Sequence, residues 1–544
     1  MDTPKPPSGI VVFGGGTATN SLVDVFERLR ESRGCTLQYV IPISDNGGSS
    51  SELIRVFGGP GIGDVRSRLV RLIPPSETDA ERASLKSLFN HRLSSDTSSA
   101  RVEWLDIVEG RHALWADISS EKRELIRSIF NHTNMEIVKR ARPSSVFNFA
   151  KASIGNLFLT GARLFTGSLE SAIYLLSTIC AIPSTVATLP AINSNFTHHI
   201  SAGLEDGSQI TGQNAISHPS APTSLPDAGD TAASPAETPS SSLTPILLTS
   251  TSTPLLRPKP STQEDPQTVL RETEAHDRIE DATLPGSLPS LRKQYITFTK
   301  SGSHNDDLPS RISRIWYINP YGHEIYPVAN PKVLSGIAAA RTVVYSIGSL
   351  YTSLVPSLIL RGVGAAVRAA HVRQKILILN SSLDRETGPS GSRALTAADF
   401  VRAIARACAE SEGTRSHNRS HAGPEHNNNN HRDPSLNPND TPELPPATEQ
   451  QQVYAPPKLQ VSHDDSDVSS VRDYVTHLLY LEGEGAPRVD RAELAALGVD
   501  CVRVYGRRQE DGVLRYDEAG LAGALEAVVG KAEMARSRRN TSGQ

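Results

Sequence analysis

The chain has 544 residues, with 55 Lys and Arg against 59 Asp and Glu, so its formal net charge is −4. This near balance argues against a general nucleic-acid binder or a protein of anionic membrane surfaces, because phosphate contacts need clustered Lys and Arg. The four cysteines lie far apart, with no C-x-x-C and no local Cys/His ligand spacing, and so indicate neither a disulfide framework nor a zinc site. Prolines and an acid near the N-terminus are unlike a secretory signal. We expect a reduced, cytoplasmic protein whose partner is a small molecule.

The N-terminal residues predict a βαβ unit. Residues 9–13 are apolar, a glycine cluster follows, and the apolar positions between 22 and 29 have helical spacing. Residues 35–44 form a second apolar run, typical of a buried strand. Because parallel strands end at one edge of their sheet, we expect the loops after both strands, residues 14–17 and 44–48, to meet there. Ligands of open α/β sheets bind at that edge.

The second loop continues into a stretch with six glycines between residues 47 and 63. So little side-chain bulk leaves backbone N–H groups exposed, and glycine tolerates the positive φ angles that turn them inward. Loops of this kind usually bind phosphate. A phosphate ligand would use Asp45 toward a cation and Arg66 as counter-charge. Its hydrogen-bond donors would be Gly47, Gly48, Ser49 and Ser50.

A dinucleotide site is a weaker interpretation of the same region. Gly14 and Gly16 supply the first two glycines of G-x-G-x-x-G, but Thr19 stands where the third belongs. Asp45, at the end of the second strand, could still hold a ribose as in Rossmann enzymes. That interpretation leaves the glycine-rich stretch after residue 46 without a role.

The middle of the chain predicts helices and one hairpin. Residues 63–73, 85–93 and 153–182 have helical apolar spacing, and residues 196–216 predict a hairpin with its turn at 205–207. Two uncharged stretches are about as long as a membrane span. Residues 171–190 contain two prolines, and residues 342–360 contain a glycine, a proline and six Ser or Thr. We interpret them as helix then strand, and as strand, loop and helix, and expect no membrane partner.

The second half repeats the order of strand and helix. Strands are predicted at residues 313–320, 341–347 and 375–380, with a helix at 331–340. Farther on, Val471, Val475, Leu478 and Leu479 have the spacing of a helical stripe, and residues 497–506 predict a last strand. The whole pattern predicts an α/β fold: a Rossmann-like, mostly parallel sheet with helices on both faces.

Two segments interrupt this order. Residues 217–290 are rich in Ser, Thr, Pro and Ala, and residues 411–465 are rich in Asn and His, so neither can bury enough apolar surface to offset chain entropy. We predict two disordered insertions. The α/β core would then consist of residues 8–216 and 291–408, with a C-terminal part at 467–535.

Seven short motifs occur in the order seen in one known family: FGGGT, SDNGGSS, GDVR, SIGN, LEDG, NP and GSLYTS. On these motifs the chain resembles the 2-phospho-L-lactate transferase (CofD-like) family, and most closely its gluconeogenesis-factor (YvcK-like) branch. The resemblance implies a Rossmann-like fold and a nucleoside diphosphate-linked ligand. One branch transfers a phospholactyl group from a guanosine diphosphate-linked donor to a deazaflavin hydroxyl with Mg²⁺. The other binds uridine diphosphate sugars and regulates metabolism.

The resemblance also implies a set of site residues. Asp45 would be the catalytic residue and the Mg²⁺ ligand. Many relatives have two adjacent acids there, and a histidine where this chain has Ala152, so binding architecture is kept better than catalytic chemistry. The residues implied to bind substrate or nucleotide are Gly14, Gly15, Gly16, Thr17, Asn46, Gly47, Gly48, Ser49, Ser50, Asp64, Arg66, Asn156, Gly348, Ser349, Tyr351 and Thr352.

Alternatives remain at the level of residues and of function. Asp64 could simply lie near a helix N-terminus, Asn156 could be a satisfied core amide, and Tyr351 could pack its ring in the core. The chain could be a phosphate-linked group transferase, a non-catalytic regulator that binds a nucleotide sugar or, less well supported, an NAD-dependent oxidoreductase. A homodimer is compatible with either of the first two.

Overall fold

The computed structural model describes residues 9–44, 47–74, 79–142, 145–218, 288, 291, 308–388, 394–417, 471–510 and 512–541. Asp45 and Asn46 lie outside these ranges, as does almost all of the two predicted insertions. Helix α15 (Ala397–His417) runs past residue 411, where the sequence places the start of the second insertion. All four cysteines carry free thiols.

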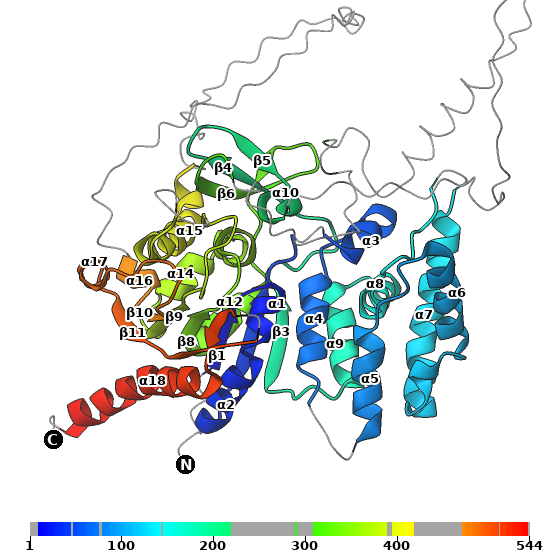
Figure 1. Ribbon diagram of the computed structural model, residues 1–544, viewed down its shortest axis with the longest axis horizontal. Helices are drawn as coiled ribbons and strands as arrows, with labels where there is room; N and C mark the ends of the chain where they lie inside the picture. Colours follow the sequence, from blue (N-terminus) through cyan, green and yellow to red (C-terminus); the bar gives the residue numbers. More distant parts are fainter. Residues whose placement is uncertain are drawn as a thin grey trace, which may run out of the picture.

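A seven-stranded parallel sheet forms the centre of the molecule (Figure 1). Its strand order is β11-β10-β9-β8-β1-β2-β3, and each neighbouring pair is parallel. This confirms the predicted α/β fold. The strands are β1 (Gly9–Phe13), β2 (Leu37–Ile41), β3 (Val186–Pro190), β8 (Ala340–Tyr345), β9 (Gln374–Ile378), β10 (His477–Tyr480) and β11 (Asp500–Arg503).

Helices cover both faces of this sheet, and β1 shows why. All five of its residues are buried: Val11 and Phe13 pack into one apolar core, and Ile10 and Val12 into another. Since neighbouring side chains point to opposite faces, a strand with no polar position must be covered twice. On one face lie α2 (Val23–Arg33) and α18 (Glu518–Thr541), side by side in Figure 1, and on the other lie α12 (Pro331–Ala339) and α15.

A helical region separates β2 from β3 in the sequence and lies beside the sheet (Figure 1). Its buried aromatic side chains, among them Trp104 and Phe130, pack against one another. Asp79, Asp96 and Ser153 each cap a helix N-terminus with a side-chain oxygen, which fixes where three of these helices begin. The elements are α3 (Ser49–Phe57), α4 (Gly63–Arg71), α5 (Ala80–Asn90), α6 (Thr97–Glu109), η1 (Ala113–Trp115), α7 (Ser120–Arg140), α8 (Ile154–Thr166) and α9 (Leu169–Ile179).

A second, antiparallel sheet has the order β5-β4-β6-β7. The predicted hairpin at 196–216 is confirmed, because β4 and β5 pair on either side of Gly207, whose φ is +85°. This sheet lies beside α10 at the top of Figure 1. The elements are β4 (His199–Leu204), β5 (Gln209–Thr211), α10 (Gln213–Ser217), β6 (Ile312–Ile318) and β7 (Glu324–Ile325).

The prediction of a helical stripe through Leu479 is wrong. Helix α16 covers only Val471–Tyr474, and the chain then enters β10, where Leu478 and Leu479 pack into opposite cores. A buried parallel strand is a continuous apolar run, and here that run happens to match helical spacing as well. The strand at 497–506 is also not the last, because β12 (Gly506–Arg508) and β13 (Leu514–Tyr516) follow it as a hairpin.

The two uncharged stretches fold as predicted. Residues 171–190 lie in α9 and β3, and residues 342–360 lie in β8, η3 (Leu350–Leu354) and α13 (Val355–Leu358). Among the described residues, no helix combines the length and the apolar character that crossing a membrane requires. The remaining helices are α1 (Gly16–Asn20), α14 (Val363–Arg368) and α17 (Arg491–Ala496).

Candidate ligand site at the carboxyl edge of the sheet

The strand order reverses its direction between β1 and β8. From β1 the chain builds the sheet outward through β2 to β3, whereas β8 starts the opposite half, which continues through β9 and β10 to β11. In open α/β sheets the crevice at such a switch point is where ligands bind. The residues that follow β1 and β8 therefore define the candidate site.

Loops far apart in sequence meet at this point. The Ser346 N–H donates to the Phe13 carbonyl at 2.9 Å, and the Thr19 hydroxyl donates to the Ile347 carbonyl at 2.7 Å. Gly348 lies on the same side, since a Cβ on it would be 3.5 Å from the Gly15 carbonyl oxygen. The structure thus brings together the two glycine turns that the sequence assigned to one ligand.

The first turn has no room for side chains at Gly14 and Gly15. A Cβ on Gly14 would lie 2.6 Å from the Thr19 hydroxyl oxygen, and one on Gly15 would lie 2.9 Å from a carboxylate oxygen of Asp64. These glycines are required for close packing of the turn. The same contact places Asp64, in the first turn of α4, directly beside the turn that follows β1. Gly16 and Thr17 begin α1.

The turn after β2 leads straight into a helix. Gly48 has φ +56° and ψ −142°, a conformation open essentially to glycine, and it precedes the first residue of α3. Ser49 and Ser50 are therefore buried in the first helical turn rather than in a long loop. Its N-cap residue is Gly48, which has no side chain to cap the helix. Its first N–H groups are the kind of donor that binds anions.

A buried ion pair fixes α3 in place. Arg55 donates to both carboxylate oxygens of Glu52, at 2.9 and 2.7 Å. Glu52 also accepts the Asn148 N–H at 2.7 Å, and Arg55 donates to the Ser145 hydroxyl at 2.6 Å. The helix is thereby tied to the segment that leads into α8. Sequence reasoning missed this pair, because i,i+3 charges on a helix usually indicate an exposed face.

The second glycine cluster, at 58–61, has a different role. Arg163 donates to the Gly58 carbonyl at 2.9 Å, and its guanidinium lies where a Cβ on Gly59 would be. The Thr197 hydroxyl donates to the Gly59 carbonyl at 2.8 Å. Gly59 makes room for Arg163, so its role is structural.

Arg66 is the buried centre of a hydrogen-bonded chain. It donates to the side-chain oxygens of Asn156 at 3.3 Å and of Asn90 at 3.1 Å, and Asn156 in turn donates to the Ser49 hydroxyl at 2.9 Å. Four helices, α4, α5, α8 and α3, supply these residues. Gly155 is needed here, since its Cβ would lie 2.8 Å from the Arg66 stem.

The charge of Arg66 is only partly compensated by the protein. Burial, followed by the neighbouring charge of Arg92, lowers its pKa to about 10, and the Asp64 carboxylate opposes that shift. The guanidinium therefore stays charged at neutral pH, while its two hydrogen-bond acceptors are neutral amides. A buried cation in this state favours an anionic partner. Asn156 is a hydrogen-bonded core amide, as one alternative predicted. It also positions Arg66 and Ser49 at the candidate site, so the two predicted roles are compatible.

The loop after β8 is held by two residues that sequence reasoning missed. Asn380 accepts the Gly348 N–H at 3.0 Å and donates to the Gly348 carbonyl at 2.8 Å. The Glu386 carboxylate accepts the N–H groups of Tyr351 and Thr352, at 2.8 and 3.1 Å, and also the Thr352 hydroxyl. Asn380 could have been found, because it ends a predicted strand at the same edge. Nothing in the local sequence singles out Glu386.

These contacts change the roles expected of Tyr351 and Thr352. Their N–H groups, assigned to a phosphate or a base, are occupied by the carboxylate of Glu386, and the Tyr351 ring is buried in the core. Ser349 precedes η3 as its N-cap residue. Burial, and then the charge of Asp384, raise the pKa of Glu386 to about 8, although its hydrogen bonds oppose the shift.

Magnesium prefers oxygen ligands, and carboxylates supply them most often. One acid at this edge is Asp64, whose carboxylate adjoins the turn after β1. Asp45, the ligand that the resemblance implies, lies outside the described residues. The donor chemistry of the edge is therefore compatible with Mg²⁺.

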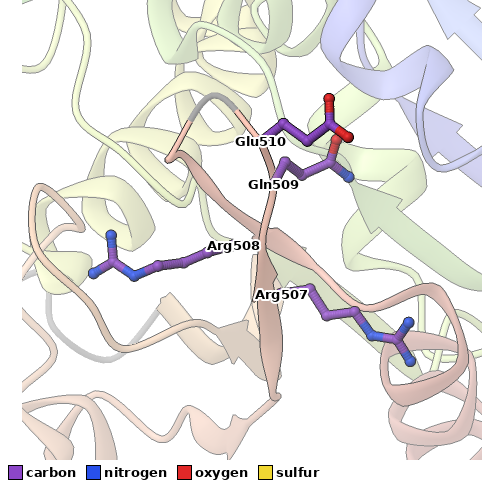
Figure 2. A pocket seen from close by; sticks show the side chains of 4 residues that line it. All are labelled: Arg507, Arg508, Gln509 and Glu510. Atoms are coloured by element: carbon purple, nitrogen blue, oxygen red, sulfur yellow. The ribbon is translucent and has the colours of Figure 1, made fainter.

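A surface hollow of about 510 Å³ lies elsewhere, on the β12 hairpin. It is lined by four consecutive residues, and Figure 2 shows the Arg507 and Arg508 side chains pointing to opposite sides of their strand. Arg507 is paired with Asp517 at 2.7 Å. Because one strand alone forms this hollow and its side chains diverge, we do not assign a ligand to it.

Together, a parallel sheet with a single reversal of strand order, two tight glycine turns and a buried arginine define a doubly wound α/β protein with polar groups gathered at its switch point. The chain belongs to the CofD family, since the family model described as 2-phospho-L-lactate transferase CofD matches residues 10–431. This confirms the family proposed from the motifs, while the YvcK-like branch stays a prediction.

Similar proteins come from a yeast and a bacterium. The chain is 42% identical over 378 residues to "Uncharacterized protein YNL011C" of Saccharomyces cerevisiae. The aligned residues make up 69% of this chain and 79% of the yeast protein. Two crystal structures of protein BH3568 from Bacillus halodurans, one described as a member of the UPF0052 family, have a TM-score of 0.48 and 17% sequence identity. The structural alignments cover 96% and 95% of this chain, and each covers 99% of the Bacillus halodurans chain.

Proposed function

We propose that the chain binds a nucleoside diphosphate-linked small molecule in the crevice between β1, β2 and β8, and transfers a phosphate-linked group from it to an acceptor hydroxyl. The observation that carries this proposal is Arg66, a buried cation whose hydrogen-bond acceptors are neutral amides. Family membership supports the reaction class, because the family model is described as a transferase.

The proposed mechanism assigns a role to each part of the edge. The diphosphate lies against the N-terminus of α3 and the turn after β1, which Gly14 and Gly15 keep compact. The acceptor oxygen forms a new P–O bond and gives up its proton to water, and the P–O–P bond of the donor breaks to release a nucleoside monophosphate. Arg66 offsets the negative charge that grows on this leaving phosphate, and Asn156 keeps the guanidinium oriented. Magnesium, held by Asp45 or Asp64, would supply further charge neutralisation on the phosphates.

A second candidate is a non-catalytic regulator that binds a nucleotide sugar. Two observations favour it. Ala152 is a buried core residue where many relatives carry a histidine, and the donors at Tyr351 and Thr352 are occupied by Glu386. Both reduce the groups available for chemistry while leaving the anion-binding groups in place. An NAD-dependent oxidoreductase remains a weaker alternative.

Ligand binding by the purified full chain tests the proposal. The ligands are guanosine and uridine diphosphates, uridine diphosphate sugars and NAD, each with and without Mg²⁺, and the readout is thermal unfolding. A true ligand at 100 times its Kd should stabilise the fold by about 2.7 kcal/mol. No stabilisation by any nucleoside diphosphate compound would overturn the proposal, and a response to NAD alone would favour the oxidoreductase.

Replacement of Arg66 tests its role directly. Arg66→Met keeps the aliphatic stem that packs on Gly155 but removes the charge, so we expect affinity for the best ligand to fall roughly 10- to 150-fold, as for a lost charge-assisted hydrogen bond of about 1.5–3 kcal/mol. Arg28→Met, on the exposed surface of α2, is the matched control and should bind normally. Calorimetry measures both. Equal affinities in the two variants would exclude Arg66 from the site.

Turnover separates the two candidates. A transferase consumes its guanosine diphosphate-linked donor when Mg²⁺ and a deazaflavin or flavin acceptor are present, and product is detected by mass spectrometry. A regulator binds a uridine diphosphate sugar whether or not Mg²⁺ is present, and leaves it intact.

A further inference from the structure

We propose that His91, Glu103 and His112 form a zinc-binding site in the helical region, separate from the crevice. His91 directly follows α5, Glu103 lies in α6, and His112 lies between α6 and η1. The distance from His91 Nε2 to Glu103 Oε1 is 2.6 Å, and from His112 Nε2 to the same oxygen it is 3.8 Å. The two imidazole rings have their centroids 5.7 Å apart.

The donor set suits zinc rather than magnesium. Two imidazole nitrogens and one carboxylate oxygen are ordinary zinc ligands, whereas Mg²⁺ prefers oxygen alone. Zinc–ligand bonds of about 2.0–2.2 Å place tetrahedral ligands roughly 3.3 Å apart. One atom from each of the three residues already lies within 4.8 Å of the others, so small side-chain rotations close the site. The fourth position would hold water.

The proposed zinc ligands are accessible to solvent, and hydrogen bonds to the backbone hold two of them in position. The side chains of His91, Glu103 and His112 are 28%, 22% and 25% exposed, which lets an ion enter. The second oxygen of Glu103 accepts the Ser94 N–H at 2.9 Å, an outer contact of the kind that orients metal ligands. The His91 carbonyl accepts the Ile154 N–H at 3.0 Å, which anchors His91 to the start of α8.

The metal-free arrangement explains why the three side chains gather without an ion. The Leu114 N–H donates to Nδ1 of His112 at 3.2 Å, so a neutral His112 carries its proton on Nε2, the nitrogen nearer to Glu103. Zinc needs the Nε2 lone pair. Binding therefore moves the ring proton to Nδ1 and gives up the contact with Leu114, while zinc takes the place of the ring hydrogens that face Glu103.

The location gives the site a structural consequence. Asn90, the residue before His91, accepts a hydrogen bond from Arg66 at 3.1 Å. A metal on His91 would brace the end of α5 and, through it, one of the two amides that hold the crevice arginine. The proposal itself stands on the three ligands and does not depend on what binds in the crevice.

The test compares the full chain, stripped with a chelator, against His91→Ala/His112→Ala. Titration with ZnCl₂ should show one more zinc per chain in the wild type than in the double variant, and the accompanying rise in Tm should be lost in the variant. Using the difference cancels zinc held by other histidines, including His417, His421, His426 and His431. Equal stoichiometry and equal Tm shifts would overturn the proposal.

Three controls keep the result interpretable. His132→Ala, which removes a half-buried histidine from the same helical region, should bind zinc as the wild type does. MgCl₂ should leave the Tm difference between wild type and double variant unchanged. If the double variant does not fold, Glu103→Gln serves instead: it keeps the shape and an acceptor oxygen, and the proposal requires it to bind zinc at least tenfold more weakly.

Discussion

Two buried ionisable side chains lie at the carboxyl edge of the sheet, and each is hydrogen-bonded to neutral groups. Arg66 donates to two amide oxygens, and Glu386 accepts from two backbone N–H groups and a hydroxyl. Isolated buried charges cost stability, so a protein retains them where they serve a purpose. Arg66 is available to an anion. Glu386 instead holds the loop after β8 and changes its protonation near neutral pH.

The raised pKa of Glu386 makes stability depend on pH. An unfolded glutamate releases its proton near pH 4.5, whereas the folded chain retains it up to about pH 8. Between these values the folded state binds more protons than the unfolded state, so stability falls as the pH rises through this window. Glu386→Gln removes this titration, because its amide can still accept the two N–H groups and donate to the Thr352 hydroxyl. We expect the variant to match the wild type at pH 5 and to have a higher Tm at pH 8.

Thermal unfolding at pH 5, 6.5 and 8 measures this difference. Glu484→Gln, at an exposed position, is the matched control and should follow the wild type at each pH. Parallel pH curves for the wild type and Glu386→Gln would show that Glu386 is ionised in the folded state throughout.

The sequence correctly predicted which residues at the site directly follow strands. Gly14, Gly15 and Gly348 meet at the edge because each comes just after a strand that the apolar pattern had predicted, and parallel strands end together. Glu386 could not be found in this way. Glu386 lies in a loop, and loops have no hydrophobic periodicity from which the burial of one carboxylate could be predicted.

Among the elements, α3 depends most on a single residue. Gly48, with φ +56° and ψ −142°, turns the chain from β2 into the helix, and a side chain there would meet open space. Any effect of Gly48→Ala therefore comes from backbone strain, which costs of order 1–3 kcal/mol in such regions. We expect lower stability and, because the N-terminus of α3 shifts, weaker ligand binding.

Gly34→Ala is a matched control for this prediction. Gly34 has the same φ of +56°, also faces open space, and ends α2 away from the crevice, but its ψ of +37° lies in the left-handed region that other residues tolerate. It should cost less stability and leave ligand affinity unchanged. Denaturant unfolding and calorimetry on both variants separate the two effects, and equal losses of affinity would contradict the assigned role of Gly48.

Element prediction succeeded where apolar period and breakers agreed. Residues 9–33 have a short apolar run, glycines and then helical spacing, and they fold as predicted. It failed at 471–481, where a four-residue helix meets a buried strand and the apolar positions fit both periods. The antiparallel pairing of β6 with β4 was also beyond sequence reasoning, since the register between distant strands is decided by tertiary packing.

For the whole molecule, the described residues on either side of each long segment belong to the same part of the structure. Residue 218 follows α10, which contacts β4 and β5, and Leu288 donates its N–H to the Pro320 carbonyl at 2.9 Å, just after β6 of the same antiparallel sheet. The helices on either side of the second segment are also joined, because the Tyr474 hydroxyl donates to Glu412 at 2.7 Å. A short connection can therefore replace each segment without moving the core.

We expect that replacing residues 219–287 or 418–470 with a short Gly/Ser linker leaves cooperative melting and ligand affinity nearly intact. Thermal unfolding and calorimetry on each variant measure both properties. A broad, non-cooperative transition in either one would show that the removed segment packs on the core.

The switch point has a consequence for how the chain folds. Phe13 and Tyr345 are paired neighbours in the sheet, although most of the chain lies between them. Pairing strands so far apart closes a very long loop, and contacts of this kind form late and slowly. During synthesis from the N-terminus, β1, β2 and the helical region can emerge and pack first, but the crevice cannot exist until β8 has left the ribosome. The switch point is therefore completed only after more than half of the chain has been synthesised.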